Sequence, residues 1–130
     1  MSGRILWHNK MVCCHENHHI TDQQFHVLFS DALESIDRDA FISEWATSSL
    51  WGDSEGHKLS AKRLNTIGVV WDAAHVTIRD IRSVTGLSQA GFGIRFCIPC
   101  RTIEDWEAGR RSCPGYIRLL LMQAVGLLQR

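Results

Sequence analysis

The stretch from Gly86 to Tyr116 constrains the fold of this chain more than any other segment. The Ser88 hydroxyl can accept a hydrogen bond from an N–H of a first helical turn, which predicts a helix over residues 89–96. Pro99 has no N–H and fits a turn, so it closes a short turn at residues 97–99. A second helix begins near Cys100 and stops at Gly109, a residue type common where helices end.

The second of these helices has an apolar side and a polar side. Ile103 and Trp106 lie three residues apart on the apolar side, together with Phe92 from the first helix. The polar side is formed by Cys100, Arg101, Glu104 and Asp105. Two helices joined by so short a turn, with a polar face left open on the second, are typical of a helix-turn-helix that reads DNA.

The order of residues in this stretch resembles the lambda-repressor/Cro (XRE) class of regulators. The shared elements are Ser88-Gln89, Phe92, Ile-Pro-x-Arg-Thr-Ile, and Trp-Glu-x-Gly-Arg-Arg at residues 106–111. The resemblance is greatest to bacterial and phage forms that carry RT(I/V)xxWExGRRxPP, and it covers about residues 78–128. Gly93 stands where the family prefers alanine and is expected to weaken its helix by about 1 kcal/mol. Cys113 replaces a proline.

The resemblance implies double-stranded DNA as the partner, and residue chemistry indicates a role for each side chain. Gln89 can bond a phosphate, Arg101 can bond guanine O6 and N7, and Glu104 can accept from a cytosine amino group. Asp105 is expected to pair with an arginine such as Arg110. A solvated face remains the alternative for Arg101 and Glu104. The predicted DNA-binding residues are Ser88, Gln89, Pro99, Cys100, Arg101, Thr102, Glu104, Asp105, Arg110 and Arg111.

Charge is distributed unevenly, although Lys+Arg and Asp+Glu both number 14. Residues 1–76 hold 6 basic and 10 acidic side chains, whereas residues 77–130 hold 8 arginines and 4 acidic side chains. The positive half therefore contains the predicted helix-turn-helix, as contacts to phosphates require.

Further helices are predicted before this segment. Thr21 and Gln24 form a capping box ahead of apolar positions that repeat from Phe25 to Ile36. Asp37 or Asp39 can cap a second helix. The remaining N-terminal positions mark two more helices, one opened by Ser60 and one capped by Thr77 over residues 78–84.

The fold class predicted from these elements is all-α. We expect a lambda-repressor-like helix-turn-helix bundle preceded by a smaller N-terminal helical region. The predicted parts are a flexible N-terminus at residues 1–20, a helical region at 21–57, and a DNA-binding domain with a lead-in helix at 58–130. Residues 58–76 bridge the two regions and can belong to the cores of both.

Residues 116–128 are predicted to form a helix that is apolar on nearly all sides, and such a helix must be buried on all sides. The helix-turn-helix core can cover only one side. The other side packs either on the N-terminal helices or on a second copy of the chain, with Leu119 or Met122 near the contact. A homodimer suits DNA with two half-sites.

The cysteines and histidines do not define a metal or cofactor site. Five cysteines without an export signal do not favour a disulfide framework. Residues 13–15 and 18–19 are rich in Cys and His and could hold zinc, but they lack the two separated ligand pairs of closed zinc sites. Cys97 and Cys100 form a CxxC motif that could act as a redox switch, although Cys97 is expected to pack in the turn.

The sequence shows no catalytic motif, signal peptide or long apolar run, so we expect a cytoplasmic protein that is not an enzyme and has no membrane partner. The predicted function is sequence-specific DNA binding, as a transcriptional repressor of a bacterium, phage or mobile element. The alternative is a protein-interaction module, such as an antitoxin or phage inhibitor, whose acidic N-terminal half binds a protein. The acidic residues Glu104 and Asp105 on the second helix favour this alternative.

Overall fold

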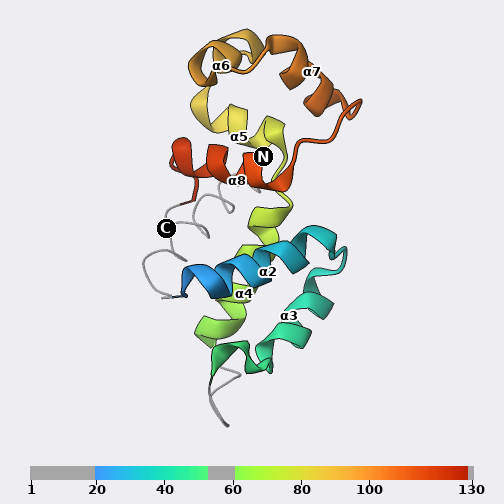
Figure 1. Cartoon of the computed structure of the whole chain (residues 1–130), viewed down its shortest axis with the longest axis vertical. Coiled ribbons are helices and arrows are strands. Elements are labelled where there is room, and N and C mark those ends of the chain that lie inside the picture. Colours follow the sequence, from blue (N-terminus) through green and yellow to red (C-terminus); the bar gives the residue numbers. More distant parts are fainter. Residues whose placement is uncertain (1–19, 53–60, 129–130) are drawn as a thin grey trace. The chain divides into compact units, whose positions relative to one another are not determined.

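The computed structural model describes residues 20–52 and 61–128. Within these ranges it contains seven α-helices, one short 3-10 helix and no strand, which confirms the all-α class (Figure 1). The elements are α2 (Asp22–Glu34), α3 (Arg38–Ala46), η1 (Ser49–Trp51), α4 (Ala61–Ala74), α5 (Ile78–Thr85), α6 (Gln89–Phe96), α7 (Cys100–Ala108) and α8 (Gly115–Ala124). The Cys/His-rich segment at 13–19, the rest of the N-terminus to residue 19 and the Ser60 cap lie outside the described residues.

The chain divides into two compact units, residues 1–75 and residues 76–130. We assigned α4 to the DNA-binding part as a lead-in helix, but it groups with α2 and α3, against which it packs. The reason is that α4 is buried on nearly every side from residue 66 to residue 74, including Ile67, Val70 and Ala73. Such a helix needs more than one covering neighbour.

The first unit follows the predicted capping signals. Thr21 and Gln24 form the capping box of α2, and Asp37 Oδ1 accepts from the Ala40 N–H at 3.2 Å to cap α3. The expectation that the apolar stripe extends to Ile36 was wrong, because α2 ends at Glu34 and the Ile36 side chain is 95% exposed. The core lies at Phe25, Leu28, Phe29, Ala32 and Phe41 and along α4.

One ion pair connects α3 to α4. Arg38 Nε donates to Asp72 Oδ1 at 2.8 Å, and Arg38 Nη2 donates to Asp72 Oδ2 at 3.2 Å. Gly68 lies one turn before Asp72, and a Cβ there would come within 2.5 Å of Arg38 Nη2. The glycine therefore provides the space in which the guanidinium lies against α4.

The second unit contains α5 to α8, and its helix ends also agree with the sequence. Thr77 and Asp80 form a capping box on α5, and Ser88 Oγ accepts from the Gly91 N–H at 3.0 Å to cap α6. Gly109 adopts a left-handed conformation after α7. The core of this unit is built from Ile78, Ile81, Phe92, Ile103, Leu121 and Met122.

The last helix differs from its prediction, since α8 ends at Ala124 instead of reaching Leu128. Gly126 has a φ of 81°, and the chain turns there so that the Leu127 N–H donates to Met122 O at 2.9 Å. Leu127 and Leu128 are buried by this turn, whereas Tyr116 and Leu120 are exposed. The helix is therefore not buried all round. Among the described residues no helix is long and apolar enough to cross a membrane.

Candidate nucleic-acid interface

The connection between α6 and α7 is a tight turn around Cys97. This residue has φ 57° and ψ 40°, a left-handed conformation that is uncommon for a residue with a side chain. The Ile98 N–H donates to Gly93 O at 2.9 Å, and the Thr102 N–H donates to Pro99 O at 2.9 Å at the start of α7. Cys97 is exposed, so the expectation that it packs inside the turn was wrong. Its left-handed backbone carries the thiol to the surface.

Gly93 allows the turn to approach α6 closely. A Cβ at this position would lie 2.5 Å from the Ile98 carbonyl oxygen and 3.3 Å from Ile103 Cδ1. The carbonyl belongs to the backbone and cannot swing aside. Glycine therefore suits this turn better than the alanine that the resembling family prefers. The expected helix penalty of about 1 kcal/mol does not include the close contact that an alanine Cβ would make with the Ile98 carbonyl.

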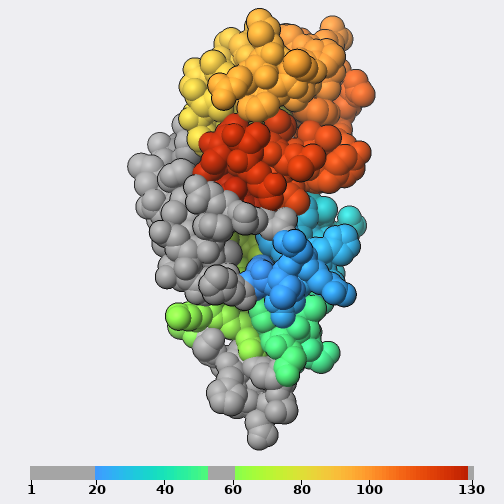
Figure 2. Space-filling model, turned by 60° about the vertical axis from the view of Figure 1, so that its left-hand side comes forward, coloured from blue at the N-terminus to red at the C-terminus, as the bar shows by residue number. Residues whose placement is uncertain are grey.

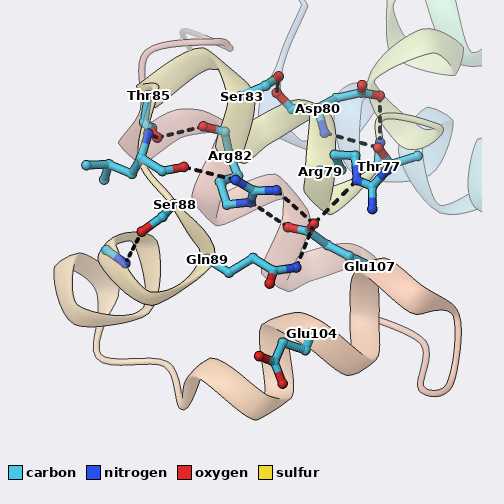
Figure 3. Close-up of polar contacts among 12 residues, drawn as sticks. Thr77, Arg79, Asp80, Arg82, Ser83, Thr85, Ser88, Gln89, Glu104 and Glu107 are labelled. Carbon is cyan, nitrogen blue, oxygen red and sulfur yellow. Dashed lines mark hydrogen bonds and ion pairs between the residues drawn. The ribbon is translucent and has the colours of Figure 1, made fainter.

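Glu107, on the inner side of α7, is the centre of a polar cluster that joins three helices (Figure 3). Arg82 of α5 donates through Nε to Oε2 at 2.7 Å and through Nη2 to Oε1 at 2.9 Å. Gln89 of α6 donates to Oε1 at 3.1 Å and Arg79 donates to it at 3.4 Å. The Glu107 side chain is 1% exposed. The cluster therefore fixes α5, α6 and α7 relative to one another.

The pKa values of this cluster reflect its pairing. The hydrogen bonds from Arg82, above all, hold the pKa of the Glu107 carboxyl below its ordinary value of 4.5, against the opposing effect of burial. The same pairing raises the pKa of Arg82. Sequence reasoning did not find this cluster, because Arg82 and Glu107 are 25 residues apart and no local pattern joins them.

Gln89 was predicted to bond a phosphate, and the structure places its amide nitrogen on Glu107 instead. An amide nitrogen carries two N–H groups, so one bond to Glu107 leaves the residue a second donor. Gln89 is half-buried at the first position of α6, directly after the exposed Ser88. Glu107 thus fixes the orientation of this side chain at the helix start.

Asp105 forms a second cluster, at the C-terminal half of α7. Its Oδ1 accepts from Arg110 Nε at 2.7 Å and from Arg101 Nε at 3.3 Å. The expected pairing with Arg110 is therefore present. Asp105 itself is only 9% exposed, which corrects its assignment to an open polar face. The hydrogen bond from Arg110 is the main reason that the pKa of Asp105 lies below its ordinary value of 3.8.

The remaining predicted contacts are divided between surface and half-buried positions. Pro99, Arg101, Arg110 and Arg111 are exposed, whereas Cys100, Thr102 and Glu104 are half-buried. The Arg101 and Arg110 side chains are 79% and 56% exposed despite their bonds to Asp105. Figure 3 shows Glu104 on α7 apart from the Glu107 cluster. The arrangement leaves cationic groups at both ends of α7.

The Cys100 thiol lacks the lowered pKa that is typical of reactive cysteines. Desolvation and the nearby Glu104 carboxyl raise the pKa of the Cys100 thiol, and its Sγ lies 3.8 Å from Glu104 Oε2. A raised pKa lowers the fraction of reactive thiolate. Within residues 20–52 and 61–128, no group of three or more His, Cys, Asp or Glu side chains is placed to hold a metal ion.

Comparison of the chain with models of protein families, with curated proteins and with solved structures gives no significant match. The likeness to the lambda-repressor/Cro class thus rests on the residues quoted above.

Proposed function

We propose that the chain is a sequence-specific DNA-binding protein in which α6 and α7 act as a helix-turn-helix and α7 enters the major groove. The observation that carries this proposal is the presence of exposed arginines at the start of α7 and directly after its end. Arg101 lies in its first turn, next to the α6–α7 connection, and Arg110 and Arg111 follow its last residue. The start of a recognition helix is the part that meets base edges in this docking geometry.

The roles of these side chains follow from their donors. The Arg101 guanidinium has a planar fork of N–H groups that matches guanine O6 and N7, and Glu104 can accept from a cytosine amino group. Arg110 and Arg111 bind phosphates without reading sequence, together with Gln89 and Ser88 at the start of α6. The excess of arginine in residues 77–130 supports this assignment.

Repression of transcription is the regulatory role that the resemblance to the lambda-repressor/Cro class suggests. A repressor of this kind acts in the cytoplasm of a bacterium and as a dimer on two half-sites. The dimer contact is proposed at the outer face of α8, which is coloured red in Figure 2. Tyr116 and Leu120 are the exposed residues there, whereas Met122 is fully buried and cannot make this contact.

The dimer is tested by analytical ultracentrifugation of the parent and of Leu120→Asp. We expect the parent to sediment as a dimer and the folded variant to sediment as a monomer, because a carboxylate in an apolar contact is strongly unfavourable. A parent that stays monomeric across a concentration series would exclude this contact.

DNA binding is tested with a pool of duplexes randomised over about two helical turns, which fits two half-sites. Sequencing of the protein-bound fraction should reveal an enriched sequence. Titrations of the enriched duplex and of a scrambled duplex at one salt concentration should then differ in Kd. If no sequence is enriched and the two duplexes bind alike, the protein is not a sequence-specific DNA-binding protein.

Arg101→Ala identifies the reading helix. The variant should lose about 1–3 kcal/mol on the enriched duplex and relax the preference at one base pair. Binding to scrambled DNA should persist through Arg110 and Arg111. Arg111→Ala is the matched control, because losing a phosphate contact should weaken both duplexes equally and reduce the salt slope by about one.

A second candidate function rests on a groove in the first unit, at the junction of α2 and α3. The exposed Ile36 lines this groove, and no Lys or Arg of the described residues does so. Four acidic residues line the same groove, namely Asp31, Glu34, Asp37 and Glu44. This chemistry fits a basic protein segment with an aliphatic residue packed on Ile36, as in the protein-binding alternative. Asp105, by contrast, no longer supports that alternative because it is buried.

The groove is tested with a labelled amphipathic peptide of lysine and leucine, by fluorescence anisotropy. Ile36→Ser and Glu44→Gln should each weaken binding. Asp39→Asn makes the same charge change as Glu44→Gln on α3 but outside the groove, and it should leave binding intact. Equal losses for Asp39→Asn and Glu44→Gln would mean that the peptide follows net charge and that the groove is not a binding site.

A further inference from the structure

The three arginines that the proposed function assigns to α7 and its end all bond to one residue. The Asp105 carboxylate accepts from Arg101 Nε at 3.3 Å and from Arg110 Nε at 2.7 Å. Its main-chain oxygen accepts from the Arg110 N–H at 2.9 Å and from the Arg111 N–H at 3.3 Å. Asp105 is therefore bonded both to the arginine at the start of α7 and to the two that follow its end.

The atoms used in these bonds leave the tips of the side chains open. Both side-chain bonds to Asp105 are made through Nε, and the two terminal nitrogens of each guanidinium take no part in them. A guanidinium has five N–H donors, so one bond at Nε leaves four at the terminal nitrogens. Each of these two arginines is thus held at Nε, where the guanidinium joins the aliphatic part of the side chain, and remains able to form a two-donor contact through its terminal nitrogens.

A side chain that is held in place before binding loses less rotamer freedom when it binds. Arginine is long and flexible, and its planar fork must be aimed to match two acceptors of one base. We propose that Asp105 is a positioning residue for DNA recognition, which aims Arg101 at a base without touching DNA itself. This inference rests on the proposed DNA-binding function of α7.

Loss of the Asp105 charge should have opposite effects on the two kinds of DNA. A carboxylate near phosphates opposes binding to any sequence, so its removal should leave binding to scrambled DNA unchanged or tighter. The same removal releases Arg101 from its orientation and should weaken binding to the preferred sequence. A residue that only supported the fold would weaken both kinds of binding together.

The experiment compares the parent protein with Asp105→Asn, which is isosteric and neutral. The enriched and scrambled duplexes are titrated at one salt concentration, after circular dichroism has shown equal helix content. The Kd for the scrambled duplex divided by the Kd for the enriched duplex should fall about tenfold, as expected when one two-donor contact to a base is no longer aligned. Asp105→Glu is a second variant that keeps the charge and moves the carboxylate by one methylene. Asp105→Glu should lower the same ratio of Kd values, and its Kd for scrambled DNA should equal that of the parent.

A double-mutant cycle assigns the effect to Arg101. In the Arg101→Ala background, Asp105→Asn should no longer change the preference at the base pair that Arg101 reads, because there is no side chain left to aim. An equal loss in both backgrounds would mean that Asp105 acts through the fold.

The outcomes separate this inference from the function on which it rests. If the parent enriches no sequence, the proposed function fails. If the parent enriches a sequence and folded Asp105→Asn and Asp105→Glu keep the full preference, DNA binding stands and the positioning role of Asp105 is wrong.

Discussion

The two units of this chain hold their helices together in different ways. The first unit uses helices of 13, 9 and 14 residues, with a core of phenylalanine and aliphatic side chains and the Arg38–Asp72 pair between α3 and α4. The second unit uses helices of 8, 8, 9 and 10 residues, of which three converge on the buried Glu107 carboxylate. Helices of this length are marginal alone and depend on tertiary contacts.

This difference has a consequence for function. In the first unit the ion pair lies against Gly68, and neither Arg38 nor Asp72 lines the groove proposed as a binding site. In the second unit, Glu107 and Asp105 project from the helix that is proposed to read DNA, and they bond Gln89, Arg101 and Arg110. Stability and binding should therefore change together in the second unit and separately in the first.

The largest expected effect comes from Glu107→Ala. Arg82 would remain largely buried without a counter-charge, keeping only its bond to the Leu87 carbonyl oxygen at 3.0 Å, and this should cost about 3 kcal/mol of the free energy of unfolding of the second unit. Amide hydrogen exchange should show lost protection in α5, α6 and α7 and unchanged protection in α2 and α4. The control is Glu44→Ala, an exposed carboxylate of α3, which should stay within about 0.5 kcal/mol. If α2 and α4 lost as much protection as α5, α6 and α7, the two units would not unfold independently of each other.

Acid should act on the same residues. The folded-state pKa values of Glu107 and Asp105 lie below the ordinary values of 4.5 and 3.8. Carboxyls with lowered pKa stabilise the fold fully above their ordinary values, and this contribution is lost as the pH falls through the folded values. The second unit should therefore lose stability below about pH 4. Urea unfolding followed by hydrogen exchange checks this, and Glu107→Gln should show a shallower pH dependence than the parent.

A smaller effect is expected from adding one methyl group to each unit at a glycine. Gly93→Ala places a Cβ against the fixed Ile98 carbonyl and should destabilise the second unit by about 2 kcal/mol. Gly68→Ala meets Arg38 Nη2, which can shift while Nε keeps its bond to Asp72, and alanine favours the helix over glycine, so the net cost should be about 1 kcal/mol or less. Gly91→Ala, whose Cβ would lie 3.3 Å from Ser88 Oγ, is the control within α6. Thermal unfolding measures the stability of each variant, and a larger drop in Tm for Gly68→Ala than for Gly93→Ala would contradict this prediction.

The features that could be predicted from sequence are those with local signals. The bounds of α6 and α7 follow from Ser88, Pro99 and Gly109, because capping residues act within one turn of the helix end. The arginines near α7 could also be identified from local sequence, because the residues around them repeat with a helical period. The all-α class also needed only these patterns.

The features that could not be predicted depend on contacts between distant residues. The apolar composition of residues 116–128 predicted a helix to Leu128. The structure instead has a turn at Gly126, and Leu127 is buried after this turn and not as part of α8. The Glu107 cluster joins residues 18 to 28 positions apart, and no local pattern identifies such partners. Placement of α4 with the first unit depended on which neighbours cover it.

The smallest expected effect concerns Cys97, where the second unit has the one left-handed non-glycine residue of the described chain. A side chain in this conformation costs about 1–2 kcal/mol, and glycine avoids that cost but loses about 0.5–1 kcal/mol through its freer unfolded state. Cys97→Gly should therefore stabilise the protein by up to about 1 kcal/mol, since the exposed thiol gives up little packing. Cys97→Ser keeps the strain and should change little, whereas Cys97→Val should destabilise because its Cβ is branched. Urea unfolding of the three variants measures the order, and a loss of stability in Cys97→Gly would show that the thiol contributes more to the turn than its exposure indicates.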